Sequence, residues 1–217
     1  MKYNVSKEKI MLILDYASDL FAEKGFDKTS IQDIQDGLGL SRGAIYHHFK
    51  SKDEILLAVF EREHDVFTRE LKEFISDVQG ETGLEKLRAI MNALLFDVKG
   101  KKMNSFFKEQ TSNSDFIVKS ITTAINEDSQ LFLPLIEEGI TDGSIQTKYP
   151  KEICQLLMLY LNLWLNGQLF PMTIEDLKAR VTVIRLSFNG LGLELFNDQF
   201  MDELLRKMKG GNDEEEE

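Results

Sequence analysis

Apolar side chains recur along most of this chain at spacings of three and four residues, which places them on one face of an α-helix. The first such stretch has apolar residues at positions 10, 13, 14, 17, 20 and 21. It lies between Ser6, which we expect to cap the helix, and Gly25, which we expect to end it. Similar stretches cover residues 53–78 and 84–98, and three prolines leave room for long helices. The pattern predicts an all-α protein.

After the first helix, the predicted helices become short. Thr29 or Ser30 can cap a helix that ends before Gly39, where a glycine suits a tight turn with positive φ. Ser41 can cap a second helix over residues 42–49. The segment therefore predicts two short helices joined by a turn.

The second short helix carries the side chains that point to a function. It begins with small residues, which let its backbone approach another surface closely. It continues with guanidinium, phenol and imidazole groups, which suit the phosphates and base edges of DNA. These residues are Arg42, Gly43, Ala44, Tyr46, His47 and His48. Ile45 and Phe49 are expected to face the core.

Residues from about 10 to 57 resemble the DNA-binding domain of the TetR family of bacterial transcriptional regulators. The resemblance rests on the run GAIYHHF at residues 43–49, on Lys52, and on the F-x-x-x-G-F end of the first helix at residues 21–26. It implies a three-helix helix-turn-helix domain whose recognition helix enters the major groove of DNA. The DNA-binding residues that the resemblance and the residue chemistry indicate are Thr29, Ser30, Ser41, Arg42, Gly43, Ala44, Tyr46, His47, His48 and Lys52.

Some of these residues have a second interpretation. Thr29 and Ser30 suit a purely structural helix cap as well as a phosphate contact. Tyr46 suits a core position as well as DNA. His47 and His48 could be a metal-binding pair, but adjacent residues on a helix do not face the same way, so we favour DNA contact or exposure.

The net charge of −11 does not by itself suggest a nucleic-acid partner. Residues 1–52, however, hold eight basic and seven acidic side chains, so their net charge is +1 and the remainder carries −12. Such an acidic remainder can orient the near-neutral segment toward DNA. Because few basic groups are available to neutralise phosphates, we expect modest non-specific affinity.

The pattern divides the chain into three parts. Residues 1–52 are the predicted helix-turn-helix DNA-binding domain, and residues 53–209 are a larger helical domain for ligand binding and dimerisation. Residues 210–217 are expected to be a disordered acidic tail. The helix expected over residues 53–78 would link the first two parts and transmit movement between them.

The larger predicted domain is rich in phenylalanine, above all between residues 103 and 133. These side chains suit a pocket for a small apolar or aromatic effector between helices, and plain core packing is the alternative for each of them. The candidate pocket residues are Phe96, Met103, Phe106, Phe107, Phe116, Ile121, Phe132 and Trp164.

The 22 residues from 153 to 174 carry no charge. That length could cross a membrane, but Gln155, Asn162, Asn166 and Pro171 interrupt it. We therefore favour a helix that is buried on two sides, against its own domain and against a partner chain.

The last long stretch has apolar residues at a heptad spacing between positions 177 and 195. With the uncharged stretch, it predicts a four-helix interface between two copies of the chain, and core packing within one chain is the alternative. The candidate dimer residues are Leu156, Tyr160, Leu163, Leu177, Val181, Ile184, Phe188, Leu191 and Leu195.

The remaining motifs argue against an enzyme. The sequence has no glycine-rich phosphate loop, no metal-spaced Cys/His cluster and no serine nucleophile elbow, so no catalytic residue, cofactor or metal is expected. One cysteine and an N-terminus without an apolar signal core favour the cytoplasm, with association to the nucleoid when DNA is bound.

These observations favour a homodimeric, ligand-responsive transcriptional regulator. It would most simply be a repressor that binds a pseudo-palindromic DNA operator and is released by a small effector. The alternative is an interaction protein on the same fold, whose larger domain binds a protein partner.

Overall fold

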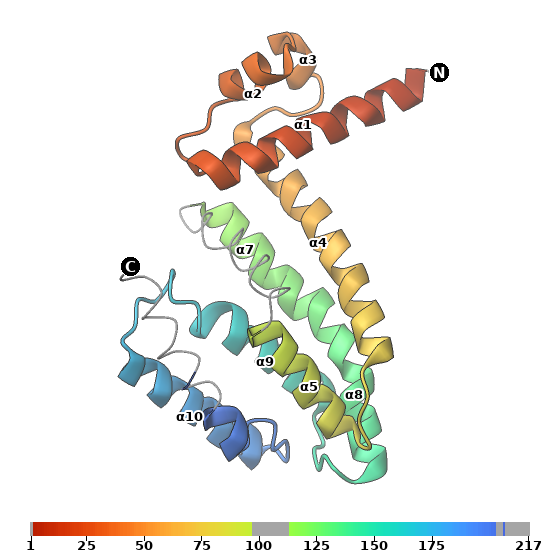
Figure 1. Cartoon of the computed structure of the whole chain (residues 1–217), viewed down its shortest axis with the longest axis vertical. Coiled ribbons are helices and arrows are strands. Elements are labelled where there is room, and N and C mark those ends of the chain that lie inside the picture. The colour runs from red at the N-terminus through yellow and green to blue at the C-terminus, as the bar shows by residue number, and fades with distance from the viewer. Residues whose placement is uncertain (1, 97–112, 203–205, 207–217) are drawn as a thin grey trace. The chain divides into compact units, whose positions relative to one another are not determined.

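The computed structural model describes residues 2–96, 113–202 and 206, without the side chains of residues 2–6, 95 and 96 (Figure 1). Every regular element in these ranges is a helix, which confirms the all-α prediction. The elements are α1 (Lys2–Lys24), α2 (Ile31–Leu38), α3 (Arg42–Tyr46), α4 (Lys52–Asp77), α5 (Gly83–Phe96), α7 (Ser114–Thr123), η1 (Ala124–Asp128), α8 (Ser129–Asp142), α9 (Pro150–Leu159), η2 (Tyr160–Trp164) and α10 (Ile174–Gly190).

The chain forms two compact units. Unit 1 comprises residues 1–70 and 103–120, and unit 2 comprises residues 71–102 and 121–217. Two helices contribute to both units, because α4 and α7 each begin in unit 1 and end in unit 2. These limits differ from the division expected at residue 52, since unit 1 also takes in the start of α7.

Unit 1 is built around the apolar stripe of α1. Ile13, Ala17 and Phe21 on this stripe are buried, as the spacing predicted. The helix already begins at Lys2, so Ser6 lies within its second turn and does not cap it. Gly25 ends the helix as expected, with a φ of +81° that favours glycine.

The core of unit 1 joins α1, α2, α3 and the first part of α4 with one residue of α7. Ile34 of α2, Ile45 of α3 and Phe60 of α4 are almost completely buried in it. Phe116 of α7 packs edge-on against Phe60, with ring centroids 5.4 Å apart. Unit 1 therefore closes its core with a residue more than fifty positions away in the sequence.

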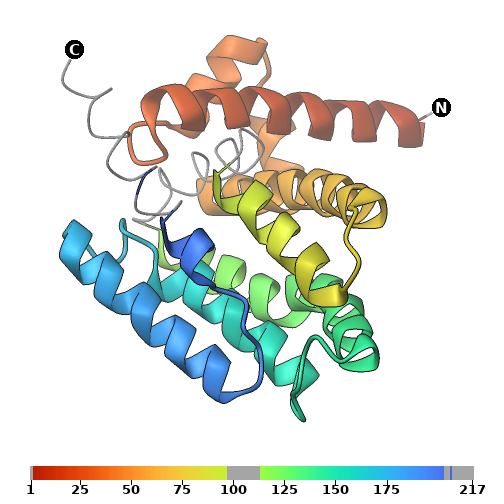
Figure 2. The ribbon, with the colours of Figure 1, turned by 60° about the horizontal axis from the view of Figure 1, so that its bottom comes forward.

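In unit 2, α8 packs against α5 and α9 (Figure 2). Pro150 opens α9 at a position where its missing N–H costs no hydrogen bond. Two π-helical segments interrupt the regular helices: η1 lies between α7 and α8, and η2 follows α9. Among the described residues, no helix is long and apolar enough to cross a membrane.

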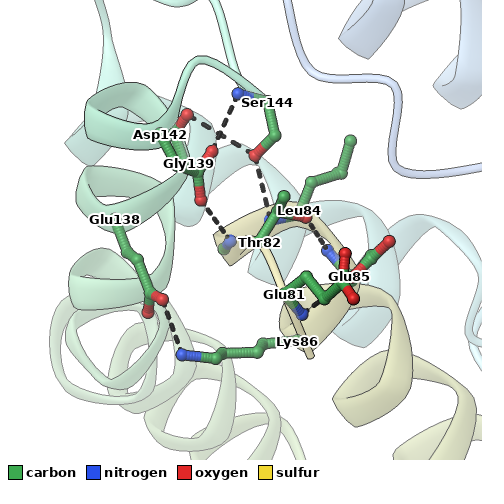
Figure 3. A network of polar contacts seen from close by, with 10 residues as sticks. Glu81, Thr82, Leu84, Glu85, Lys86, Glu138, Gly139, Asp142 and Ser144 are labelled. Carbon is green, nitrogen blue, oxygen red and sulfur yellow. Dashed lines mark hydrogen bonds and ion pairs between the residues drawn. The ribbon is translucent and has the colours of Figure 1, made fainter. Parts of the chain in front are cut away.

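A polar network fastens the start of α5 to the end of α8 (Figure 3). The Gly83 N–H donates to Asp142 Oδ2 at 2.7 Å, and the Leu84 N–H donates to Ser144 Oγ at 3.3 Å. Lys86 forms an ion pair with Glu138 at 2.6 Å. The Gly83 and Leu84 amides in the first turn of α5 are thus capped by side chains from the end of α8 and the turn after it, whereas Thr82 caps the Glu85 amide.

The close approach of α5 and α8 depends on glycine. A Cβ at residue 83 would lie 2.3 Å from the Gly139 nitrogen and 2.5 Å from the Leu135 carbonyl oxygen. Such distances are far inside van der Waals contact, so the two backbones could not meet this way with a side chain at residue 83. Gly83 therefore sets the separation of α5 and α8.

The structure corrects the predicted course of the last helix. α10 ends at Gly190, and Gly192 adopts a φ of +83°. The chain then turns, and the Gly192 carbonyl accepts the Gln146 N–H at 2.9 Å. Leu195 is therefore not on the heptad seam.

Several predicted dimer residues face the chain's own core instead. Val181, Ile184, Phe188 and Leu195 are each at most 3% exposed. A second copy of the chain cannot contact side chains that are already covered, so these four are corrected to core residues. The other predicted dimer residues remain partly exposed: Leu156, Tyr160, Leu163, Leu177 and Leu191.

Candidate DNA-binding interface

The start of α2 is held by a capping box. Ser30 caps the helix, its hydroxyl accepts the Asp33 N–H at 3.1 Å, and the Asp33 carboxylate accepts the Ser30 N–H at 2.7 Å. Hydrogen bonds from the backbone and the hydroxyl of Ser30, with the nearby charge of Lys24, lower the pKa of Asp33. Ser30 itself is exposed, so it stands at the surface where α2 begins.

Thr29 does not share this surface position. It is 2% exposed, and its hydroxyl donates to the Gly25 carbonyl at 2.9 Å and to the Leu20 carbonyl at 3.3 Å. Both the cap role and the phosphate contact considered for this side chain are therefore corrected. Thr29 fixes the corner between α1 and α2.

The turn between α2 and α3 follows the predicted chemistry. Gly39 has a φ of +62°, the left-handed conformation that glycine adopts without strain. Ser41 caps α3, and its hydroxyl accepts the Ala44 N–H at 3.3 Å. α3 ends at Tyr46 and is three residues shorter than expected, because the N–H groups of His48 and Phe49 both donate to the Ile45 carbonyl.

One side of α3 is fixed in the core and the other is open to solvent. Ile45 is fully buried and Phe49 is 6% exposed, as predicted. On the outer side, the Arg42 guanidinium lies 5.2 Å from the centre of the Tyr46 ring, and Tyr46 is 39% exposed. This arrangement presents a positive group and a phenol together.

The small residues and the imidazoles complete the outer side of α3. A side chain at Gly43 would meet open space, so the backbone there is accessible. Ala44 is half-buried, His47 is exposed, and the His47 and His48 rings stand edge to face with centroids 4.9 Å apart. Among the described residues, no group of three or more His, Cys, Asp or Glu side chains could hold a metal ion.

Lys52 is placed differently from the other candidates. Its ammonium donates to the Phe26 carbonyl at 2.6 Å and lies 4.1 Å from the centre of the Phe26 ring. The side chain is half-buried and packs against Phe26. In this DNA-free structure it is not part of the exposed side of α3.

Sequence reasoning missed two contacts that shape this unit. The Tyr16 ring covers Gly37, where an added Cβ would lie 2.0 Å from the tyrosine oxygen. Asn113 donates from its amide to Asp53 at 2.6 Å, and its carbonyl oxygen accepts the Phe116 N–H at 2.8 Å. A glycine inside the short helix α2 was a signal for the first contact. No sequence signal marked the second, because its partners lie 60 residues apart.

Of the candidate pocket residues, the structure describes the side chains of Phe116, Ile121, Phe132 and Trp164. Met103, Phe106 and Phe107, and the side chain of Phe96, lie outside the described residues. Phe116 is corrected from pocket to core, because it is 2% exposed in the core of unit 1. In unit 2, Phe132 is buried, whereas Ile121 and Trp164 are partly exposed.

Comparison with known families decides what the short helices are. Residues 13–59 match the family described as bacterial regulatory proteins, tetR family. The chain therefore contains a TetR-family DNA-binding domain. The match covers α2, α3, the second half of α1 and the first part of α4, so α3 stands where the recognition helix of this family is expected. The family description, of regulatory proteins, supports the expectation that the chain is not an enzyme.

Relatives extend the likeness beyond this TetR-family domain. The chain is 32% identical over 123 residues to the uncharacterised regulator YerO of Bacillus subtilis, a match that covers 57% of this chain but only 38% of YerO. It is 28% identical over 151 residues to the transcriptional repressor KstR2 of Rhodococcus jostii, over 65% of this chain and 70% of KstR2.

Solved structures show the same fold over nearly the whole chain. A TetR-family regulator from Pectobacterium atrosepticum has a TM-score of 0.63 and 21% identity, and the match covers 88% of this chain and 97% of that one. At this level of identity the likeness concerns the fold alone. It shows that the helices of unit 2 also follow an arrangement found in the TetR family.

Proposed function

We propose that this protein is a transcriptional regulator, and specifically a repressor, that binds double-stranded DNA through α3. The observation that carries the proposal is the two-sided character of α3. Ile45 holds one side in the core, while Arg42, Tyr46 and His47 stand on the other. A rigidly held helix with exposed guanidinium, phenol and imidazole groups suits base edges and phosphates. The likeness to KstR2, a relative named a repressor, supports repression over activation.

Within this proposal the contacts have distinct roles. Arg42 reads a base edge or holds a phosphate, and Tyr46 contributes its hydroxyl to a phosphate. The exposed backbone at Gly43 lets α3 lie close to the DNA. Ser30 and Ser41 stand at helix starts, where free amides suit phosphate oxygens.

The protein would bind DNA as a homodimer. The face of α10 opposite Val181 and Ile184 carries Val183 and Leu186, which are 47% and 66% exposed. Exposed branched apolar side chains on a helix are typical of a contact with another protein surface. This face of α10, with the partly exposed Leu156 and Leu163, replaces the seam first expected, and pairs the two copies around a two-fold axis.

An effector bound in unit 2 would change the DNA affinity of unit 1. α4 and α7 each contribute to both units, so a shift of either helix reaches the DNA-binding domain. The effector must bind one arrangement of the units better than the other, or the equilibrium does not move. The partly exposed Ile121 and Trp164 suit an apolar or aromatic compound.

Selection of duplexes from a random-sequence pool tests the DNA-binding proposal. We expect the wild-type protein to select a pseudo-palindrome with half-sites about one or more helical turns apart. Tyr46→Ala should weaken binding to that duplex at least tenfold, because a hydrogen bond to a charged phosphate is worth roughly 1.5–3 kcal/mol, and leave the dimer intact by light scattering. Tyr149→Ala is the matched control, because Tyr149 is an exposed tyrosine in unit 2. Equal affinity of the Tyr46 variant and the wild type would refute the role of α3.

A further inference from the structure

We propose that Asn92 of α5 is the polar contact of the effector site in unit 2, and that the effector is a mostly apolar molecule with a hydroxyl or N–H donor. The inference rests on the proposed function and deepens it, because it names the chemical group that the effector must carry. An apolar site alone discriminates weakly between compounds of similar size and shape.

The first support is a hydrogen-bond acceptor without a donor. Asn92 Oδ1 is buried, and no group among the described residues donates a hydrogen bond to it. Buried amide oxygens normally have a partner, because burial has removed their hydrogen bonds to water. Within the described parts of the chain, this is the one buried side-chain oxygen or nitrogen that lacks a partner. The residue as a whole is half-buried, so a small molecule can reach the amide.

The second support is the sequence around Asn92. The last eight residues of α5 read AIMNALLF, so Asn92 is the only polar residue in the stretch 89–96. Ile90 and Met91 beside it are completely buried. A trapped water needs two to four polar partners, and this part of α5 offers a single polar side chain. A ligand that is apolar and brings one donor of its own matches these surroundings better.

The third support is the contrast with Arg88, one helical turn earlier. Residues four positions apart lie on the same face of a helix, so Arg88 and Asn92 follow one another along α5. The Arg88 guanidinium donates to the carbonyls of Glu194 and Leu195, which fixes this side of the helix. No described group fixes Asn92 Oδ1 in the same way. The amide is therefore presented from an anchored helix, as a specific ligand contact requires.

The fourth support is that asparagine is a costly residue at this position. An alanine there would remove the unpaired acceptor and would also favour the helix more than asparagine does. Residues that reduce the stability of the free protein in this way are typical of binding sites. The donor of a bound effector would restore the missing hydrogen bond.

The first experiment measures the melting temperature of the free protein. Asn92→Ala removes the unpaired oxygen, and Asn189→Ala is the matched control for helix propensity, because Asn189 is exposed on α10. We expect Asn92→Ala to raise the melting temperature by about 2–4 °C more than the control does. A rise no larger than that of the control, or a fall, would mean that the amide is already bonded in the free protein, and would overturn the proposal.

The second experiment tests the chemistry of the ligand with two probes. Phenol carries a hydroxyl donor, and anisole has a methyl group in place of that hydrogen. Each is titrated into ¹⁵N-labelled protein, and binding is followed by the side-chain amide signals of Asn92, which are identified by their absence from the Asn92→Ala spectrum. We expect phenol to bind about fivefold more tightly than anisole, the factor that one hydrogen bond implies. A phenol affinity no greater than that of anisole, or no response to either probe, would refute the ligand role.

The third measurement separates this inference from the proposed function. Fluorescence anisotropy gives the affinity for the selected duplex with and without saturating phenol. We expect phenol to weaken duplex binding by the wild type and to leave that of Asn92→Ala unchanged. A wild type that selects a duplex but does not respond to phenol would overturn the effector role of Asn92. If the wild type selects no duplex, the proposed function fails, and the melting temperatures and the Asn92 signals still decide whether Asn92 binds a donor.

Discussion

The two units of this protein differ in how far along the chain their internal polar contacts reach. In unit 1, the polar contacts that begin α2, α3 and α4 join residues three or four positions apart, namely Ser30 with Asp33, Ser41 with Ala44, Ser51 with Glu54 and Lys50 with Glu54. In unit 2, the contacts that hold α5 reach 52 to 107 positions along the chain, to Glu138, Asp142, Ser144, Glu194 and Leu195. The caps at the starts of α2, α3 and α4 thus come from neighbours in the sequence. The start of α5 has local caps as well, between Glu81 and Glu85 and between Thr82 and Glu85, but it also depends on partners that meet only after folding.

Phe116 is an exception that tests this contrast, because it completes the core of unit 1 from a distant position. Phe116→Ala should cost about 4 kcal/mol of unfolding free energy, the usual cost of deleting a buried phenylalanine. The single tryptophan, Trp164, lies in unit 2, so its fluorescence follows that unit, whereas circular dichroism follows all helices. We expect the urea midpoint measured by circular dichroism to fall further than the midpoint measured by tryptophan fluorescence.

Val118→Ala provides the control for Phe116→Ala, since Val118 is on the same helix and 62% exposed. It should change either midpoint little. If both probes shift equally in Phe116→Ala, the two units unfold as one cooperative body and the contrast drawn here does not extend to stability.

Gly83→Ala should have the opposite effect on the two probes, because it destabilises unit 2. The added methyl would overlap the Gly139 backbone, and relieving that overlap should cost about 3 kcal/mol, at the upper end for overpacking. The loss should be larger by Trp164 fluorescence than by circular dichroism. Gly190→Ala is the control, because a Cβ there meets open space and alanine favours a helix. An unchanged Gly83→Ala midpoint would mean that α5 and α8 can separate without cost.

The smallest expected effect concerns acid pH. Hydrogen bonds from the Ser144 hydroxyl and from the Gly83 and Ser144 N–H groups lower the pKa of Asp142 from 3.8. A carboxylate with a lowered pKa stabilises the folded state above its unfolded pKa, and this contribution is lost as the pH falls through the folded pKa. Asp142→Asn should therefore lower the melting temperature at pH 6, and the difference from wild type should narrow below about pH 4.

Asp198→Asn tests whether that pH effect is specific to the network, because the Asp198 side chain is 87% exposed. Its melting temperature should stay close to the wild-type value throughout. A difference between Asp142→Asn and wild type that stays constant from pH 6 to pH 3 would contradict the assigned role of the ionised carboxylate.

The same contrast explains what the sequence could predict. Ser41 and Gly39 were assigned correctly because their hydrogen-bond partners, Ala44 and Asp36, lie three positions away in the sequence. The dimer seam was misassigned at Val181 and Ile184, because heptad spacing marks an apolar face without saying which surface covers it. Lys52 illustrates the same limit. Its acceptor is the Phe26 backbone carbonyl, and every residue has such a carbonyl, so the sequence does not identify the partner.

One further irregularity was visible in the spacing, although it was not recognised. Buried positions in α7 and α8 follow helical steps except between Ala124 and Ser129, which are five residues apart and both buried. The Ser129 N–H donates to the Ala124 carbonyl, so the π-turn η1 brings these two residues onto one face. A π-turn amounts to one extra residue in an α-helix. A homologue with an uninterrupted helix here should therefore align with a gap of one residue within 124–128, and an ungapped alignment would compare α8 with the wrong face of its counterpart.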